Sequence, residues 1–154
     1  MTASGFDLDG PLGFCSNFDA TPFRVPELGV VVRTAEHAFN ALKTTDPIER
    51  GNVLIAPTPS RAKARGRHVT LRPGWDGGGR VLAMQRVLIA KFSLDSLAEK
   101  LYATGTERLV ESNTWHDNFW GDCTCGSARC AHPGTNMLGE LLMAVRARGW
   151  DGWP

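Results

Sequence analysis

Apolar residues recur at helical spacing along much of the chain, and a short β-branched run precedes the first clear helix. Residues 30–32, three valines in a row, are the clearest strand candidate. Thr34 then suits the N-cap of a helix that ends near Lys43. Glu36 and Asn40 share one face of this helix with Lys43, apart from its apolar stripe. The pattern therefore predicts a polar helix face beside a buried one.

The rest of the pattern predicts further helices joined by short connections rich in glycine and proline. The glycine run at 75–79 indicates a turn, because glycine tolerates open backbone conformations. Gly149 suits the end of the last helix. The expected helices cover residues 48–54, 60–66, 81–92 and 94–102, and a last one begins near residue 135. We therefore expect one mostly helical α+β domain over residues 1–154, with a few short strands.

Composition describes an ordinary globular protein. The chain has 154 residues, 42% hydrophobic and 21% charged, which suits one domain and excludes a disordered chain. The net charge of +1 gives no global attraction to nucleic acid or membrane, so such binding would need a local patch. No signal peptide is visible, and no run approaches the roughly 18 apolar residues of a membrane span. We therefore expect a cytoplasmic protein.

Glu36 is the first candidate for chemistry. Its carboxylate shares a helix face with Asn40 and Lys43, and the preceding loops can form a pocket wall. A simpler explanation also exists, because the helix dipole favours a negative charge in the first turn of any helix. The residues alone leave both interpretations open.

The second candidate is the segment 109–122, with the sequence LVESNTWHDNFWGD. It combines acidic side chains with two indole rings, Trp115 and Trp120, which suit a flat aromatic ligand. The alternative is a core hairpin in which the Trp rings are buried and the acids face water. The residues alone do not decide between these interpretations.

Basic side chains gather between residues 61 and 72, with no acid between Asn52 and Gly74. Arginine pairs with phosphate through two parallel hydrogen bonds, so this run suits phosphate or pyrophosphate. A solvated helix face is the alternative. The basic residues of the run are Arg61, Lys63, Arg65, Arg67 and Arg72.

Four soft metal ligands lie within ten residues, in the spacing C-x-C-x4-C-x-H: Cys123, Cys125, Cys130 and His132. Zinc prefers four such donors in a tetrahedron. In a reducing compartment, structural zinc or unliganded thiols explain the cluster better than a disulfide does. A catalytic cysteine is disfavoured, because no sequence feature marks one thiol for activation.

Six segments match, in order, the motifs of one protein family. They are CSNF at 15–18, TAEHAFNALK at 34–43, TPSRAKARGRHVTLRPGWD at 58–76, MQRVLIAKF at 84–92, LYATGTERLVESNTWHDNFWGD at 101–122 and GTNMLGELLMAVR at 134–146. On these motifs the chain resembles the NADAR, or YbiA-like, family over nearly its whole length. The connection CTCGSARCAHP at 123–133 departs from the pattern, because many relatives have a short glycine-rich link there.

The resemblance implies an N-glycosidase with the YbiA-like fold. Members act on phosphoribosylamino-pyrimidine intermediates of riboflavin synthesis, or on ADP-ribose attached to guanine in nucleic acid, where they reverse a DNA ADP-ribosyltransferase toxin. The matching motifs place functional weight on Glu36, Trp75, Asp117 and Trp120. Further candidates for substrate binding are Asn17, Asn40, Lys43, Arg61, Lys63, Lys91, Gly121 and Asn136. We expect no membrane partner.

Cleavage at ribose C1′ passes through an oxocarbenium-like state and needs negative charge, an activated water and a proton for the departing nitrogen. We expect Glu36 or Asp117 to supply the charge and activate the water, with the other acid in support. Trp75 and Trp120 would stack on the base or the ribose. No cofactor is needed for this chemistry, and zinc would be structural. The competing hypotheses are a module that binds ADP-ribose without cleaving it and a zinc-stabilised interaction protein.

Overall fold

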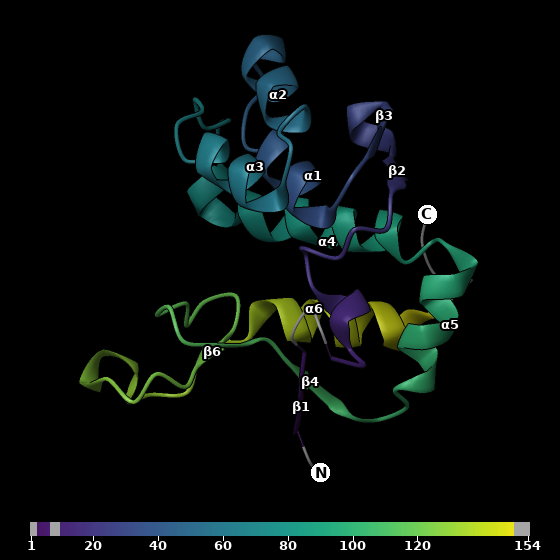
Figure 1. The fold of residues 1–154 in the computed structure, drawn as a ribbon, viewed down its shortest axis with the longest axis vertical. Coiled ribbons are helices and arrows are strands. Elements are labelled where there is room, and N and C mark those ends of the chain that lie inside the picture. Colours follow the sequence, from purple (N-terminus) through teal and green to yellow (C-terminus); the bar gives the residue numbers. More distant parts are fainter. Residues whose placement is uncertain (1–2, 7–9, 150–154) are drawn as a thin grey trace. The chain divides into compact units, whose positions relative to one another are not determined.

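The computed structural model describes residues 3–6 and 10–149, which form a mostly helical domain with a few short strands (Figure 1). This agrees with the predicted fold class. The chain divides into two compact units, one made of residues 17–94 and the other of the segments on either side of them. Among the helices of the described residues, none has the length and apolar character that a bilayer crossing requires.

Residues 17–94 form a small helical unit with one hairpin. In the hairpin, β2 (Phe23–Val25) pairs antiparallel with β3 (Val30–Val32), and Gly29 closes the turn with a φ of 69°. The helices are α1 (Ala35–Ala41), α2 (Pro47–Leu54), α3 (Pro59–Gly66) and α4 (Arg80–Lys91). The strand at 30–32 and the predicted helices are therefore present, with boundaries within one or two residues of the expected ones.

Side-chain caps explain where these helices begin. Thr34 accepts the N–H of His37 at the start of α1, as the sequence predicts. Asp46 accepts the N–H groups of Ile48 and Glu49 at 2.8 and 2.9 Å at the start of α2. Thr58 caps α3 in the same way, and a proline occupies the first helical position of both α2 and α3.

Helix α1 is the centre of this unit and contacts α2, α3 and α4. Small buried side chains, including Ala41 and Ala62, fill the space between α1, α2 and α3. A Cβ atom at Gly66 would collide with the side chain of Asn40, so glycine allows α3 to lie close to α1. This close approach brings Lys63 of α3 near Glu36 on the polar face of α1.

The glycine run at 75–79 forms an open turn, as the sequence predicts. Residues Trp75–Gly79 lead directly into α4, and the backbone is not helical at Gly77 and Gly78. Gly78 has a φ of 107°, which a residue with a side chain rarely adopts. The open conformation expected of glycine is therefore present just before α4 begins.

The second unit is built around α6 (Met137–Arg148). It contains α5 (Asp95–Ala103), the parallel pair β1 (Ala3–Gly5) and β4 (Arg108–Val110), and the parallel pair β5 (Ser112–Asn113) and β6 (Asp122–Cys123). Helix α6 packs on β4, where a Cβ atom at Gly139 would collide with the carbonyl oxygen of Leu109. The parallel pairing of β5 and β6 shows that the hairpin alternative for residues 109–122 is wrong.

Candidate active site

Glu36 is a buried carboxylate that the fold holds in place. Its side chain is 7% exposed in the first turn of α1. Asn40, one turn later, donates from Nδ2 to Oε1 of Glu36 at 3.0 Å and to its backbone carbonyl oxygen at 2.8 Å. The carbonyl oxygen of Asn17 accepts the N–H of Glu36 at 3.0 Å. Glu36 therefore has more interactions than capping a helix requires.

Positive charge surrounds this carboxyl group. Burial raises the pKa of Glu36, although Lys63, the hydrogen bond from Asn40 and Lys43 all act in the opposite direction. Burial lowers the pKa of Lys43; Glu36 opposes this shift, whereas Lys63 and Arg67 add to it. A carboxyl group with a raised pKa can exchange a proton closer to neutral pH than an exposed one can.

Trp75 packs against the aromatic ring of Phe39 in α1. The side chain is 5% exposed, and its ring lies 5.3 Å from the ring of Phe39, tilted by 45°. The Nζ atom of Lys43 lies 5.5 Å from the centre of the Phe39 ring. The structure thus assigns Trp75 a packing contact, and its stacking on a substrate stays a prediction.

Some basic side chains of residues 61–72 already bind other groups of the protein. Arg65 donates to the carbonyl oxygen of Asn52 at 2.6 Å, beside a surface hollow of about 470 Å³ that Glu36 does not line. Arg72 forms an ion pair with Glu27 at 2.9 Å. Glu27 precedes the basic run in the chain, so the absence of acids between residues 52 and 74 did not reveal this partner. Because Arg65 and Arg72 already have these partners, the structure gives no support to the expectation that they bind phosphate.

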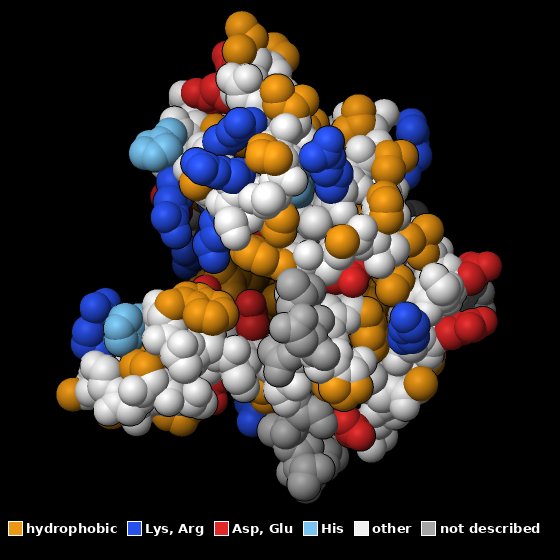
Figure 2. All heavy atoms as spheres, viewed as in Figure 1, with side chains coloured by type: hydrophobic (Ala, Val, Ile, Leu, Met, Phe, Trp, Pro, Cys, Tyr) orange, Lys and Arg blue, Asp and Glu red, His pale blue; other side chains and the backbone are white. Residues whose placement is uncertain are grey.

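Among the residues that the structure describes, three basic side chains of α3 and its C-terminal end form no such hydrogen bond or ion pair: Arg61, Lys63 and Arg67. Lys63 is partly buried toward Glu36, whereas Arg61 and Arg67 are exposed. Figure 2 shows Lys and Arg side chains gathered over α3 and the segment that follows it. The basic surface therefore extends from the buried acid outward to solvent.

Lys91 and Asn17 are both buried, with different consequences. Lys91 is fully buried, and its Nζ atom lies 3.5 Å from Oδ1 of Asp19. This ion pair explains the buried charge, so the expected phosphate contact of Lys91 has no support.

Asn17 donates to the sulfur of Met84 at 3.6 Å, and its own Oδ1 has no hydrogen-bond partner. Asn17 therefore has one buried polar atom without a hydrogen-bond partner, and its contact with a substrate stays a prediction.

In the second unit, Asp117 holds its own turn together. Its Oδ1 accepts the N–H groups of Phe119 and Trp120 at 3.1 and 2.9 Å. Asn113 fixes the backbone of Asp117 from both sides, donating to its carbonyl oxygen at 2.7 Å and accepting its N–H at 3.1 Å. The carboxylate therefore already has a structural task, which the sequence did not indicate.

The same turn caps helix α6 through its backbone. The carbonyl oxygens of Phe119 and Trp120 accept the N–H groups of Met137 and Leu138, both at 3.0 Å. These are among the donors that a helix start leaves without partners. A Cβ atom at Gly121 would collide with a backbone carbonyl oxygen, so Gly121 serves close packing rather than an evident ligand contact.

Asn136 is also structural. It is fully buried, its Oδ1 accepts the N–H of Glu111 at 2.9 Å, and its Nδ2 donates to Leu109 at 2.8 Å. Both ends of the amide are thus used to hold the chain around β4. A contact of Asn136 with ribose or phosphate stays a prediction.

Two aromatic rings of this segment differ in exposure. Trp120 is partly buried and stands edge-on to Phe119, with ring centres 4.9 Å apart and an angle of 83°. Trp115 is 61% exposed. Trp120 is therefore oriented by its neighbours, whereas Trp115 projects from the surface.

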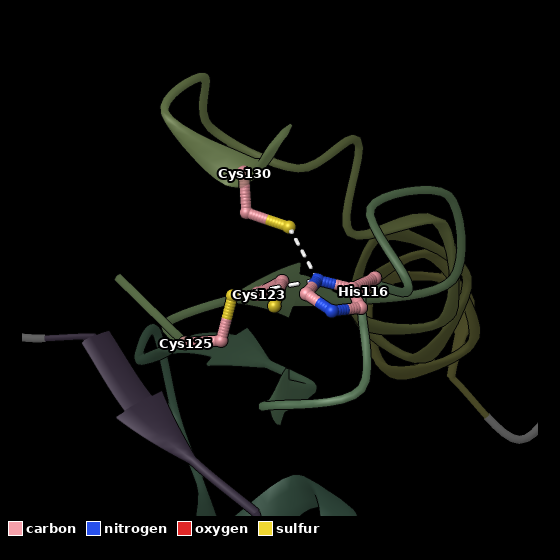
Figure 3. A group of neighbouring side chains, drawn as sticks. All are labelled: His116, Cys123, Cys125 and Cys130. Carbon is pink, nitrogen blue, oxygen red and sulfur yellow. Dashed lines mark hydrogen bonds between the residues drawn. The ribbon is translucent and has the colours of Figure 1, made fainter. Parts of the chain in front are cut away.

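The predicted metal ligands need one correction. Cys123, Cys125 and Cys130 come together as expected, but the fourth donor is His116 rather than His132. The ligand atoms of these four residues all lie within 4.8 Å of one another (Figure 3). His132 is exposed and lies outside the group. The spacing H-x6-C-x-C-x4-C could have indicated this ligand set in the sequence. It joins His116 of the segment 109–122 to the cysteine cluster that follows.

Comparisons with known proteins identify the family and the fold. The NADAR domain profile matches residues 7–149. The NMR structure of the E. coli protein YbiA is similar, with a TM-score of 0.77 and 30% identity, covering 96% of this chain and 86% of that one. Among curated proteins, none matches significantly. The expected boundary of one domain at 1–154 stays a prediction. The chain belongs to the NADAR domain family.

Proposed function

We propose that this protein is an N-glycosidase that hydrolyses the bond between ribose C1′ and a base nitrogen. Family membership supports this reaction class, because the NADAR family is associated with N-glycosidase activity. The observation that carries the proposal is the buried Glu36 carboxyl group, held by Asn40 and surrounded by Lys43 and Lys63. Burial of a carboxylate costs free energy that the nearby cations offset only in part, which favours a chemical role over a purely structural one.

In this proposal Glu36 carries out the chemistry. Its carboxylate removes a proton from water as the water oxygen bonds to C1′ and the bond from C1′ to nitrogen breaks. The departing nitrogen then takes a proton from the Glu36 carboxyl group. Negative charge on Glu36 also stabilises the positive charge that develops on the ribose ring. The reaction consumes one water and needs no redox cofactor.

Asp117 acts as a positioning residue in this proposal. Its Oδ1 already accepts two backbone N–H groups, which fixes the turn that carries Trp120. Trp120 offers a partly exposed indole ring for stacking on a base, worth about 1–3 kcal/mol. Any ion in the cluster of His116 and the three cysteines is structural here, because four protein donors leave no open coordination position.

The distribution of positive charge favours a substrate with several phosphates. Lys43 and Lys63 lie near the acid, and Arg61 and Arg67 extend the positive surface to solvent. ADP-ribosylated guanine in DNA carries a pyrophosphate and backbone phosphates, whereas a phosphoribosylamino-pyrimidine carries one phosphate. We therefore propose the DNA adduct as the substrate, and a DNA ADP-ribosyltransferase toxin as the enzyme whose product is removed.

A product assay with purified protein tests this proposal. Guanine-ADP-ribosylated DNA and a phosphoribosylamino-pyrimidine are offered in parallel, and released ADP-ribose or ribose phosphate is measured. Cleavage of the DNA adduct supports the proposal, and cleavage of the pyrimidine alone moves the substrate to the metabolic class. If neither is cleaved but calorimetry detects tight binding of ADP-ribose, the protein is a binding module and the enzymatic proposal is wrong.

A further inference from the structure

We infer that His116, Cys123, Cys125 and Cys130 bind one structural Zn²⁺ ion that orders the segment between β5 and α6. All four donors belong to the second compact unit, and their ligand atoms lie within 4.8 Å of one another. Figure 3 shows the ring of His116 facing the three thiols, which come from the end of β6 and the turns that follow it. This inference does not depend on the proposed reaction.

The distances around His116 fit a tetrahedral ion. Its Nδ1 atom lies 3.3 Å from Sγ of Cys130 and 3.4 Å from Sγ of Cys125. Zn–N and Zn–S bonds of ordinary length predict an N···S edge of about 3.6 Å in a tetrahedron. One ring N–H can point well at only one sulfur, whereas a cation at the centre satisfies the nitrogen and both sulfurs together.

The backbone around the cluster is arranged to support these donors. His116 has a φ of 67°, an uncommon value for a residue with a side chain, and this conformation presents its ring to the thiols. The N–H of Ser127 donates to Sγ of Cys125 at 3.4 Å, as second-layer donors do at metal thiolates. The N–H of Cys123 is held by Asn118 at 2.8 Å.

The segment has little else to hold it together. Between residues 114 and 135, only Gly121 and Cys123 are buried. A chain that cannot bury apolar side chains needs a cross-link or a metal to stay ordered. Three thiolates and one imidazole select a soft or borderline ion over Mg²⁺ or Ca²⁺. Donor atoms this close together suit a single ion, and Zn²⁺ is the ion that such sites usually hold.

Metal content of the purified, reduced protein is the first test. Elemental analysis should find about one zinc per chain, and Co²⁺ added to metal-free protein should give the absorption of a tetrahedral thiolate complex. H116A and C130S should lose both signals in the presence of a competing chelator. H132A and C15S are the matched controls and should keep them, since His132 and Cys15 lie outside the cluster.

Hydrogen exchange is the second test and addresses the order of the segment. Removal of zinc should speed amide exchange at least tenfold across residues 114–135, while residues 47–66 keep their rates. The inference is overturned if reduced protein binds neither Zn²⁺ nor Co²⁺, if H132A rather than H116A loses the metal, or if the cysteines are found joined in a disulfide. E36Q should retain its zinc, which separates failure of this inference from failure of the proposed reaction.

Discussion

The Nδ2 atom of Asn40 lies 3.0 Å from Oε1 of Glu36 and 2.8 Å from the carbonyl oxygen of the same residue. One amide thus holds both the side chain and the backbone of the acid. Asn40 is itself fully buried, and the absence of a side chain at Gly66 makes room for it. The geometry of the acid therefore depends on a residue that need not touch a substrate.

Replacement of Asn40 by alanine should shift the pH dependence of catalysis. The hydrogen bond from Asn40 lowers the pKa of Glu36, so its loss should raise that pKa further. The acidic limb of the kcat/KM profile should move to higher pH, and the fold should lose about 1–3 kcal/mol of stability. N52A is the control, because the side chain of Asn52 is exposed. An unmoved acidic limb in folded N40A would contradict the coupling.

Replacement of Glu36 by glutamine should stabilise the fold at neutral pH. The pKa of Glu36 is raised in the folded state, so its stabilising contribution is complete at low pH and is lost as pH rises through the folded pKa. Glutamine avoids that loss. Urea unfolding should therefore find E36Q more stable than wild type at pH 7–8 and similar to it near pH 4, whereas E99Q, at an exposed position, should show no such trend. Equal stability at all pH values would mean that burial does not strain this acid.

Replacement of Lys63 by glutamine should weaken substrate binding. Loss of one charge-assisted contact with phosphate corresponds to about 1.5–3 kcal/mol, or at least a tenfold rise in KM. The dependence of KM on salt concentration should also become shallower. R24Q removes an exposed positive charge from β2 of the same unit and should leave KM unchanged. An equal effect of both variants would show only general attraction between charges.

Two replacements of Asp117 distinguish positioning from chemistry. Asparagine keeps an oxygen that can accept the N–H groups of Phe119 and Trp120, whereas alanine does not. D117N should therefore retain turnover within about tenfold, while D117A should lose about 1 kcal/mol of stability and most of its turnover. Turnover abolished in a folded, zinc-containing D117N protein would place Asp117 in the reaction itself.

Local signals in the sequence predicted much of the fold. Thr34 caps α1 as expected, and the strand at 30–32 and the helices lie close to their predicted positions. These features depend on neighbouring residues, so a single sequence contains them. The parallel pairing of β5 with β6 depends on contacts across the intervening loop, and the pattern of side chains did not reveal it.

The candidate site was predictable to a smaller extent. Glu36 and Asn40 share one face of α1, as their spacing indicated, and Lys43 lies just beyond the end of this helix. The partners of Arg72 and Lys91 lie 45 and 72 residues away in the chain, as Glu27 and Asp19, so both residues resembled free cations. His116 was overlooked as a metal ligand because the turn that directs its ring toward the cysteines is a property of the fold.

The most direct test of the central claim is the turnover of E36Q on a guanine-ADP-ribosylated oligonucleotide, measured beside wild type and E99Q. We predict that wild type and E99Q release ADP-ribose at equal rates and that E36Q is slower by at least a hundredfold, with its fold and zinc content intact. Release of ADP-ribose by folded E36Q at the wild-type rate would contradict the assignment of the chemistry to Glu36.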